Sequence, residues 1–344
     1  MQLDTAIYGL TDAADRARAL EAAGFDGVFT FEGPHDVFLP LALAAAATSL
    51  HTMTNVAIAL PRNAIHLAHA ARDLQLLSEG RFVLGLGSQI RPQIERRFGV
   101  AFDHPVDRMR DTVEAVRAIL RAWQDGTPLD HRGPYRTHTM MTPMFDPGPS
   151  PWGPPPVHLG ALGPRMTEMA AEVADGLLVM PFTSERFFTG TTMRHVDAGL
   201  ARAGRTRADL SLVAELIVCV GRTDAEMAEA EAGTRALLGF YGSTPSYRPV
   251  LEVEGRGELQ PELRRLSKEG RWGEMGDLVD DELLATIAVR GTPAEVAAQL
   301  ADRYHGVADR VAVYLPYGAA DDLLADLAAA VREAVGARVS GPEG

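Results

Sequence analysis

The segment EGRFVLGLGSQIRPQIERRFG, at residues 79–99, contains the pattern that decides the fold. Residues 82–86 are apolar throughout, as expected of a strand buried on both faces in a parallel sheet. The strand then ends in Gly87-Ser88-Gln89, and charged residues follow. Such an abrupt end is either an ordinary turn or one wall of a ligand site. The rest of the chain has to decide between these two interpretations.

Strand and helix patterns alternate along most of the chain, which is typical of parallel strands joined by crossover helices. Strands are predicted at residues 3–10, 25–31, 55–60, 82–87, 157–162, 176–180, 210–221 and 310–317. Helices are predicted at residues 12–23, 40–50, 67–77, 109–123, 165–174, 185–203 and 321–335, and capping boxes at Thr223 with Glu226 and at Thr292 with Glu295 start two more. Eight such units predict an α/β fold, a TIM (β/α)8 barrel formed as a single domain by residues 1–344.

Two segments interrupt the alternation and are predicted to be insertions in the barrel. Residues 125–156 contain nine prolines together with aromatic residues, which indicates an ordered excursion and not a flexible linker. Residues 240–281 are irregular in pattern and precede the last strand. We expect the second segment to form a lid or a rim element beside the barrel.

The composition excludes several classes of protein. The net charge is −13, which opposes binding to nucleic acid, because such binding needs clustered positive charge. The single cysteine, Cys219, excludes internal disulfides and a metal cage built from cysteines. The longest apolar run, at residues 39–47, is too short to cross a bilayer, and the first residues lack the basic segment of a signal peptide. We therefore expect a soluble cytoplasmic protein without a membrane partner.

In a TIM barrel the chemistry takes place at the carboxyl ends of the strands, so residues that follow the predicted strands are the candidates for a site. Glu32, His35 and Asp36 follow the second strand and could supply acid–base chemistry, although Gly33 and Pro34 also suit a plain turn. His66 and His69 have a spacing that allows metal binding. No third ligand lies near them in the sequence, so a structural role is favoured and no metal is expected.

The segment GALGPRMTEMA, at residues 160–170, follows another predicted strand. Its glycines allow a ligand to approach the backbone, and a helix is predicted to begin near Pro164. Free amide groups at a helix start attract a phosphate, and Arg165 adds positive charge. The alternative is a plain glycine-rich turn between strand and helix.

Six segments occur in an order that resembles the bacterial luciferase-like superfamily, and more closely its coenzyme F420-dependent oxidoreductase branch. They are AAGFDGVF, AAAATSL, NVAIALPRN, ARDLQLLSEGRFVLGLGS, PPPVHLGALGPRMTEMAAEVADGLLV and VRGTPAEVAAQLADRY. The resemblance covers nearly the whole chain. It implies a luciferase-like TIM barrel that binds a flavin or a 5-deazaflavin at its mouth, the end where the strands' carboxyl termini lie.

The resemblance also implies roles for individual residues. It places a β-bulge at the end of the third strand, with a cis peptide bond between Ala57 and Ile58. It implies a ring contact from Glu32, a bulge formed by Ala57, Ile58 and Ala59 that backs the ring, and a polar contact of Ser88 with the cofactor or the substrate. It further implies that Leu162, Gly163, Arg165 and Met166 hold the phosphate side chain and that Met180 and Thr183 contact the tail. Gly85 and Gly87 are then predicted to leave room beneath a planar ring.

Two departures from the family's sugar-phosphate dehydrogenases limit what the resemblance implies. Those enzymes have a histidine directly after the acidic residue, where this chain has Gly33, and His35 comes two residues later. They also have a glutamate after the fourth strand, where this chain has Ile90. Oxidation of sugar phosphates is therefore not expected, and Glu32 and His35 are the candidate catalytic residues.

The prediction is an oxidoreductase that transfers a hydride between coenzyme F420 and a small organic substrate. Phe38, Tyr241, Tyr314 and Tyr317 are the candidates for the lining of its substrate pocket, although Tyr314 and Tyr317 could equally be structural. One alternative keeps the fold but uses reduced FMN in a monooxygenase. A second alternative is a barrel without a redox cofactor, either a hydrolase or a binding protein. The family suggests a homodimer, and a reductase for F420 or flavin is a possible partner.

Overall fold

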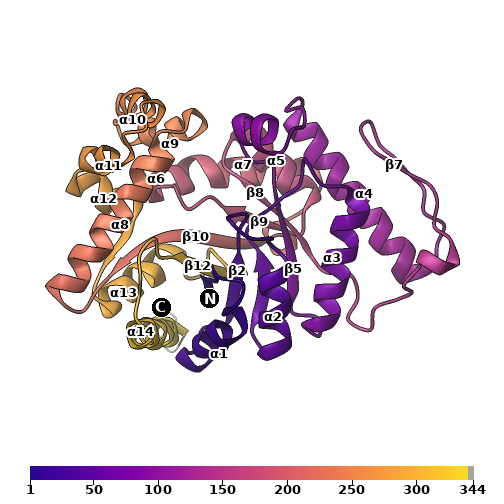
Figure 1. Cartoon of the computed structure of the whole chain (residues 1–344), viewed down its shortest axis with the longest axis horizontal. Helices are drawn as coiled ribbons and strands as arrows, with labels where there is room; N and C mark the ends of the chain where they lie inside the picture. The colour runs from indigo at the N-terminus through magenta and orange to yellow at the C-terminus, as the bar shows by residue number, and fades with distance from the viewer. Residues whose placement is uncertain (340–344) are drawn as a thin grey trace.

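A closed barrel of eight parallel strands forms the centre of the computed structural model, which describes residues 1–339 (Figure 1). Its strands are β1 (Gln2–Ala6), β2 (Gly27–Thr30), β3 (His51–Thr54), β5 (Phe82–Gly87), β8 (Val157–Ala161), β9 (Gly176–Val179), β10 (Ser211–Val220) and β12 (Arg310–Tyr314). The barrel closes because β1 pairs with both β2 and β12, and β10 pairs with both β9 and β12. The predicted TIM barrel is therefore confirmed.

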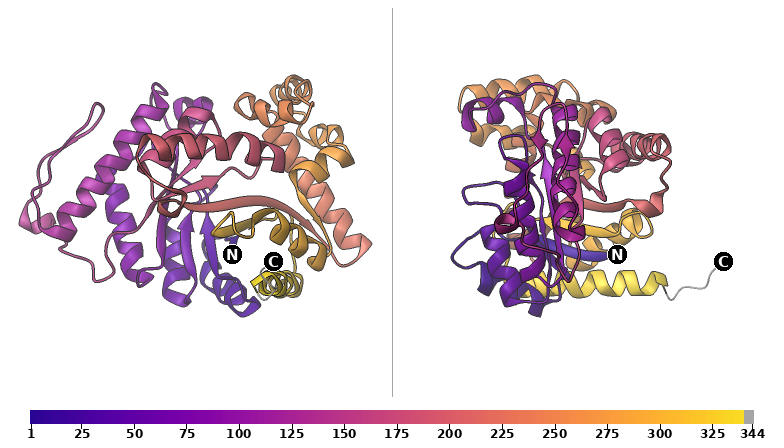
Figure 2. Two further views of the ribbon diagram at one scale, coloured as in Figure 1. Left: turned by 180° about the vertical axis from the view of Figure 1, so that it is seen from behind. Right: turned by 90° about the vertical axis from the view of Figure 1, so that its right-hand side faces the viewer.

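Helices surround the barrel and bury their apolar faces against the outer sides of the strands (Figures 1 and 2). They are α1 (Ala13–Ala23), α2 (Leu39–Ala47), α3 (Ala64–Leu77), α4 (Pro105–Asp125), α5 (Pro164–Val173), α7 (Met193–Arg202), α8 (Asp224–Gly242), α13 (Pro293–Tyr304) and α14 (Asp321–Val339). The capping box predicted at Thr292 and Glu295 is present. At Thr223 only half of the predicted box forms, because the Glu226 carboxylate accepts from the backbone N–H of Arg222 instead.

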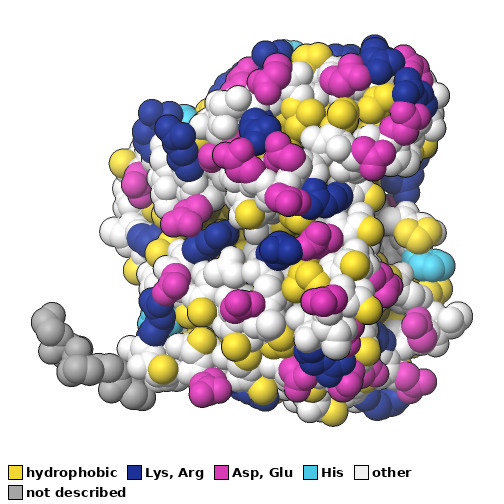
Figure 3. All heavy atoms as spheres, turned by 90° about the vertical axis from the view of Figure 1, so that its left-hand side faces the viewer, with side chains coloured by type: hydrophobic (Ala, Val, Ile, Leu, Met, Phe, Trp, Pro, Cys, Tyr) yellow, Lys and Arg dark blue, Asp and Glu magenta, His cyan; other side chains and the backbone are white. Residues whose placement is uncertain are grey.

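The two predicted insertions have different structures. Residues 125–156 include a hairpin of β6 (His131–Arg132) and β7 (Thr137–His138), which extends away from the barrel (Figures 1 and 2). Residues 240–281 are largely helical and contain α9 (Arg248–Val253), α10 (Leu259–Lys268), α11 (Trp272–Met275) and the start of α12 (Asp281–Ile287). The face of the molecule on this side carries basic and acidic side chains interspersed (Figure 3).

No helix within residues 1–339 is both long and apolar enough to cross a membrane. The same residues contain no group of three or more His, Cys, Asp or Glu side chains arranged to hold a metal ion. His69 packs on Trp123, with ring centroids 4.7 Å apart, as the structural interpretation of this histidine predicts.

The interior of the barrel is layered. Because side chains of a strand alternate between its two faces, every second residue points inward. The layer near the amino ends of the strands is polar and contains a buried ion pair between Asp4 and Arg310, whose Nε lies 2.7 Å from Asp4 Oδ2. The middle layer is apolar and consists of Ala6, Phe29, Met53, Val83, Leu178, Val213 and Ala312. The site lies above this apolar layer, at the mouth.

The third strand is interrupted where a bulge was predicted, but the prediction placed the break in the wrong position. The strand starts at His51 instead of Asn55, ends at Thr54, and resumes as β4 (Ala57–Ile58). The cis peptide bond joins Asn55 to Val56, so the predicted cis bond between Ala57 and Ile58 is wrong. Those two residues pair regularly with Leu86 and Gly87 of β5, which explains why the break lies before them.

The hydroxyl group of Thr54 bridges this break. Three residues, 54–56, lie opposite only two residues of β5, because Met53 pairs with Val83 and Ala57 pairs with Leu86. Thr54 Oγ1 accepts from the Gly85 N–H (2.9 Å) and donates to the Gly85 carbonyl (2.8 Å). One side chain thus replaces the backbone hydrogen bonds that the extra residue displaces.

The two glycines of the opening segment are required by this bulge. A Cβ at Gly85 would overlap the carbonyl oxygen of Thr54 and lie 2.7 Å from Leu178 Cδ1. A Cβ at Gly87 would overlap a methyl group of Val56, whose other methyl lies 3.0 Å from the Cβ position of Gly160. The Thr54 carbonyl and Leu178 thus fill the room at Gly85, and Val56, which packs on the apolar interior layer, fills the room at Gly87.

The first prediction concerns Gly85. We expect Gly85→Ala to lower the free energy of unfolding by about 3 kcal/mol or more, because its methyl group would overlap backbone at the bulge. Gly190 is the matched control, since a Cβ there would meet nothing within 4 Å. Gly190→Ala should not lower the free energy of unfolding and should raise it by up to about 1 kcal/mol, because Gly190 lies in a helical segment with room for a methyl group. Denaturant unfolding of both variants measures this, and equal stabilities would contradict the role of Gly85.

The second prediction concerns His158, which is buried in the polar layer at the amino ends of the strands. Burial lowers its pKa to about 4, and its Nδ1 has no hydrogen-bond partner. The unfolded chain binds a proton at this residue below its ordinary pKa of about 6.5, while the folded chain does not. Folding stability is therefore lost as the pH falls from about 6.5 to about 4, by about 3 kcal/mol.

His158→Gln removes this titrating group. Denaturant unfolding of wild type and variant across that pH range measures the difference between their two slopes. We expect the wild type to lose about 3 kcal/mol more than the variant over this range. Parallel slopes would show that His158 does not cause the acid sensitivity.

Candidate functional site

The residues predicted from the sequence lie around the mouth of the barrel, but in different environments. Ala57, Ile58 and Ala59 are fully buried at the bulge, and the Thr183 side chain is buried after β9. Leu162 and Met180 are half-buried and pack into the apolar cluster below the helical insertion. Ser88 is half-buried after β5, and its hydroxyl group donates to the Gln89 carbonyl (3.3 Å).

Glu32 lies after β2 and is held in place by Arg62. Arg62 Nη1 and Nη2 lie 2.7 Å and 2.9 Å from the two carboxylate oxygens of Glu32. Glu32 Oε2 also accepts from the backbone N–H of Ile58 (3.0 Å), and Arg62 donates to the Ile58 carbonyl (2.8 Å). Both oxygens of Glu32 are thus engaged in holding β4 beside the bulge. The Arg62 guanidinium lies 5.7 Å from the centroid of the Phe38 ring.

His35 and Arg165 are exposed side chains at the mouth. Within the described chain neither has a hydrogen-bond or ion-pair partner. Arg165 lies in the first turn of α5, which begins at Pro164 after Gly163, and no side chain caps this helix start. A Cβ at Gly163 would meet nothing within 4 Å, so the approach to the helix start is open. Uncapped amide groups and an unpaired cation suit an anionic group.

Aromatic rings cover the barrel interior at the mouth. Tyr8, Phe31 and Tyr314, which follow or end three neighbouring strands, have ring centroids 5.7 to 6.0 Å apart. Phe182, Tyr241 and Tyr247, from the loop after β9, from α8 and from the insertion, form a second group with centroids 6.0 to 6.1 Å apart. Tyr241 and Tyr314 were predicted to line a pocket, and both belong to these groups.

Glu215 is the residue that the sequence prediction missed. It points inward from β10 and is only 8% exposed, and Oε2 accepts from Asn55 Nδ2 at 3.0 Å. Burial raises its pKa to about 8, so this carboxyl group is mostly protonated at neutral pH. The signal was present in the sequence as one acidic residue within an otherwise apolar strand, LSLVAELIVCV, at residues 210–220.

An apolar cavity of about 490 Å³ opens beside the first aromatic group. Its lining is formed by Tyr8, Gly233, Ala236, Leu237, Tyr314, Leu315, Pro316 and Tyr317. The hydroxyl group of Tyr317 is already used, because it accepts from the Val220 N–H (2.8 Å) and donates to the Val218 carbonyl (3.1 Å). Tyr317 therefore anchors the loop after β12 on β10, whereas Tyr8 and Tyr314 lie between the cavity and the interior.

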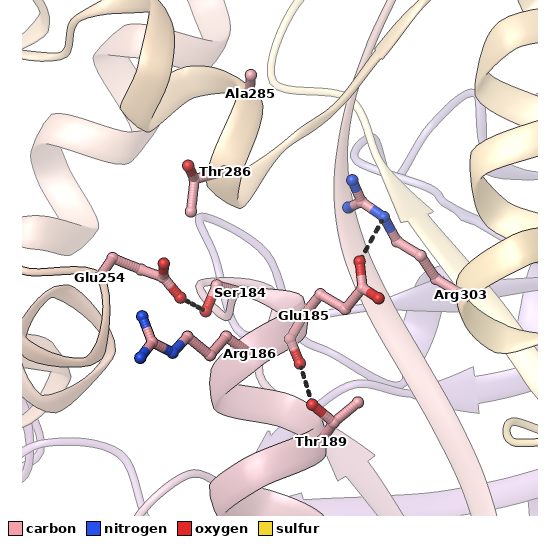
Figure 4. Close-up of a pocket in the computed structure, with 8 residues that line it drawn as sticks. All are labelled: Ser184, Glu185, Arg186, Thr189, Glu254, Ala285, Thr286 and Arg303. Atoms are coloured by element: carbon pink, nitrogen blue, oxygen red, sulfur yellow. Dashed lines mark hydrogen bonds and ion pairs between the residues drawn. The ribbon is translucent and has the colours of Figure 1, made fainter.

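A second hollow, of about 350 Å³, lies beside the short helix α6 (Glu185–Phe187) (Figure 4). Two polar contacts cross it: the Ser184 hydroxyl donates to Glu254 at 2.5 Å, and Arg303 Nε lies 3.3 Å from Glu185. This hollow contains none of the predicted site residues. We therefore place the candidate site at the aromatic mouth.

The chain belongs to the luciferase-like monooxygenase family, whose model matches residues 2–310. It is 50% identical over 313 residues to an uncharacterized protein of Mycobacterium tuberculosis strain H37Rv, covering 90% of this chain and 92% of that protein. It is 30% identical over 240 residues to the 5,10-methylenetetrahydromethanopterin reductase of Archaeoglobus fulgidus, covering 68% and 67% of the two chains.

Among solved structures, the coenzyme F420-dependent tetrahydromethanopterin reductase of Methanopyrus kandleri has the same fold. The TM-score is 0.82 at 20% sequence identity, and the match covers 96% of this chain and 98% of the reductase. The luciferase-like fold predicted from the sequence is thus confirmed, and the family identifies the chain as an oxidoreductase.

The third prediction concerns the ion pair between Glu32 and Arg62, whose side chains are 9% and 20% exposed. Glu32→Gln should lower the free energy of unfolding by about 2 kcal/mol, because it removes the close counter-charge of a partly buried guanidinium and leaves only Asp36, 4.0 Å away, as its ion-pair partner. Glu95→Gln is the matched control, since Glu95 pairs with Arg91 on the open surface. That change should cost less than about 0.5 kcal/mol. Losses of similar size in the two variants would contradict a structural role for Glu32.

Proposed function

We propose that the protein is an F420-dependent oxidoreductase that transfers a hydride between the deazaflavin and a small organic substrate. The observation that carries the proposal is that two features occur together at the mouth of the barrel: a side chain that could lie against a planar ring, and a helix start that could bind a phosphate. Val56 projects over Gly87 and Gly160 beside β4, and an uncapped helix with the unpaired Arg165 follows β8. The named function of the Methanopyrus kandleri reductase, which shares this fold, supports the proposal.

The residues at the mouth suit a planar ring that carries an anionic tail. Arg165 and the free amides at the start of α5 suit a phosphate, and Leu162, Gly163 and Met166 lie beside them. Met180 and Thr183 would contact the rest of the tail. Ala57, Ile58, Ala59 and Ser88 would surround the ring, on β4 and at the end of β5. When bound, the deazaflavin would supply or accept a hydride, and the protein would orient it and exclude water.

Glu32 and His35 stay predictions as acid–base residues. The ion pair with Arg62 and the hydrogen bond from the Ile58 N–H support a positioning role for Glu32 as the alternative to acid–base chemistry. His35 is exposed and has no hydrogen-bond or ion-pair partner within the described chain, so its imidazole is accessible to a ligand at the mouth.

FMN remains the alternative cofactor, because it too has a planar ring and a phosphate, and with reduced FMN the enzyme would be a monooxygenase. The third possibility, a barrel without a redox cofactor, disagrees with membership of an oxidoreductase family. We further propose a homodimer and a separate reductase that supplies reduced cofactor. A cytoplasmic location belongs to the same proposal.

The fourth prediction concerns cofactor choice and Arg165. In calorimetric titrations of F420 and FMN into the protein, F420 should bind at least about tenfold more tightly than FMN. Arg165→Glu should weaken F420 binding by about tenfold or more, because it replaces the cation beside the phosphate with an anion. Arg121→Glu is the matched control, since Arg121 is exposed on α4 and unpaired in the described chain.

The three outcomes of the titrations separate the alternatives. A preference for FMN would assign the protein to the monooxygenases. Binding of neither compound, by protein shown to be folded, would exclude the redox function. Equal weakening by Arg165→Glu and Arg121→Glu would show that the start of α5 does not hold the phosphate.

A further inference from the structure

Glu215 is a buried carboxyl group without a counter-ion. Other buried carboxylates of the barrel have one, since Asp4 pairs with Arg310 and Glu32 pairs with Arg62. Within residues 1–339, Glu215 has no ion pair with Arg, Lys or His, and its one hydrogen-bond partner is Asn55. A charge buried in this way is costly unless it is paired, so the neutral acid is the stable form.

The orientation of Glu215 is fixed from one side. Asn55 Nδ2 donates to Oε2 at 3.0 Å, and the Asn55 backbone N–H donates to the Thr30 carbonyl at 2.7 Å, which holds Asn55 itself. In the described chain the second oxygen, Oε1, has no hydrogen-bond partner, and it is not fully shielded from solvent. Oε1 is therefore the atom of Glu215 that is free to reach a ligand.

Four tyrosines surround Glu215 closely enough for its charge to raise the pKa of each. They are Tyr8 from β1's end, Tyr241 from α8, Tyr247 from the insertion and Tyr314 from β12. Tyr8 donates to the Leu315 carbonyl at 2.9 Å, but the hydroxyl groups of the other three have no partner in the described chain. These three side chains are half-buried and their hydroxyl groups are not sealed from solvent, so the hydroxyl groups are available to hydrogen-bond a ligand beside Glu215.

We propose that Glu215 donates the proton that accompanies hydride transfer to a neutral substrate with a polarised C=O or C=N bond, bound among these tyrosines. This inference rests on the proposed F420-dependent function. The substrate is neutral because, within the described residues, no cation pairs with Glu215 to receive an anionic group, and the neutral Glu215 offers no charge to a cationic one. Apolar and aromatic groups flank the reacting bond, since rings form the walls.

The atoms and electrons of this step balance. The substrate carbon receives a hydride from the reduced deazaflavin, and the π bond breaks toward the heteroatom. The heteroatom takes a proton from Glu215 Oε1, so one O–H bond breaks and one O–H or N–H bond forms. The substrate gains two electrons, the deazaflavin loses two, and Glu215 is left as a carboxylate that regains its proton from water.

The experiment compares wild type with Glu215→Gln, which keeps the shape and the contact with Asn55 but cannot donate an acidic proton. The first readout needs neither cofactor nor substrate. Infrared difference spectra between about pH 6 and about pH 10 should show the C=O stretch of a protonated carboxylic acid in wild type and not in the variant. Glu168→Gln, which removes an acid on α5 outside the barrel, should retain this band.

The second readout is the reduction of benzaldehyde, cyclohexanone and the cyclic imine 1-pyrroline with reduced F420. We expect Glu215→Gln to lower kcat/KM by at least about 100-fold and to leave the affinity for F420 within about threefold. The wild-type rate should fall above about pH 8, as Glu215 loses its proton. The wild-type pH profile tests the same point if the variant does not fold.

Four results would overturn the inference, and they differ from a failure of the proposed function. The first is an ionised Glu215 at about pH 6, and the second is full activity of Glu215→Gln with bound F420. The third is loss of activity in His35→Gln but not in Glu215→Gln. The fourth is that protein which binds F420 reduces none of the three probes. If F420 does not bind at all, the proposed function itself fails, and the proton-donor role fails with it.

Discussion

The bridge between the Thr54 hydroxyl and the backbone of Gly85 is the contact on which the mouth of the barrel depends. It supplies hydrogen bonds to both the N–H and the carbonyl of Gly85 where three residues of one strand face two of the next. The extra residue turns Val56 into the barrel and places Asn55 where its amide reaches Glu215. The bulge therefore determines both the position of Val56 beside β4 and the orientation of the buried Glu215.

Most of the fold could be predicted from the chain because hydrophobic periodicity is a local property. Strands with apolar residues throughout alternate with amphipathic helices, and eight such units have few other ways to bury their faces. The third strand was misplaced for the opposite reason. Residues 51–54, HTMT, have a weaker strand pattern than the largely apolar residues 55–60. Pairing with β5 nevertheless makes residues 51–54 the strand and interrupts the pairing before residue 57. Register depends on partners distant in sequence, which periodicity does not encode.

The candidate site could be predicted only in part, for an electrostatic reason. The sequence shows which residues follow each strand, so the segments around Glu32, Ser88 and Arg165 could be placed at one end. It does not show which carboxyl group meets a cation. Arg62 lies thirty residues after Glu32, and its guanidinium is directed to Glu32 by the helix and strand between them. Glu215, which lies within an apolar strand, receives an amide and no cation.

Environment therefore gives the two carboxyl groups different capacities. Glu32 accepts hydrogen bonds from a guanidinium and a backbone amide, so its oxygens hold the bulge. Burial favours the neutral form of Glu215, and the contact with Asn55 engages only its Oε2. Pairs of acids whose surroundings differ in this way commonly divide the work of an active site between a fixed charge and a proton donor. Because Asn55 connects the bulge to Glu215, the bulge that positions Val56 also orients the carboxyl group of Glu215.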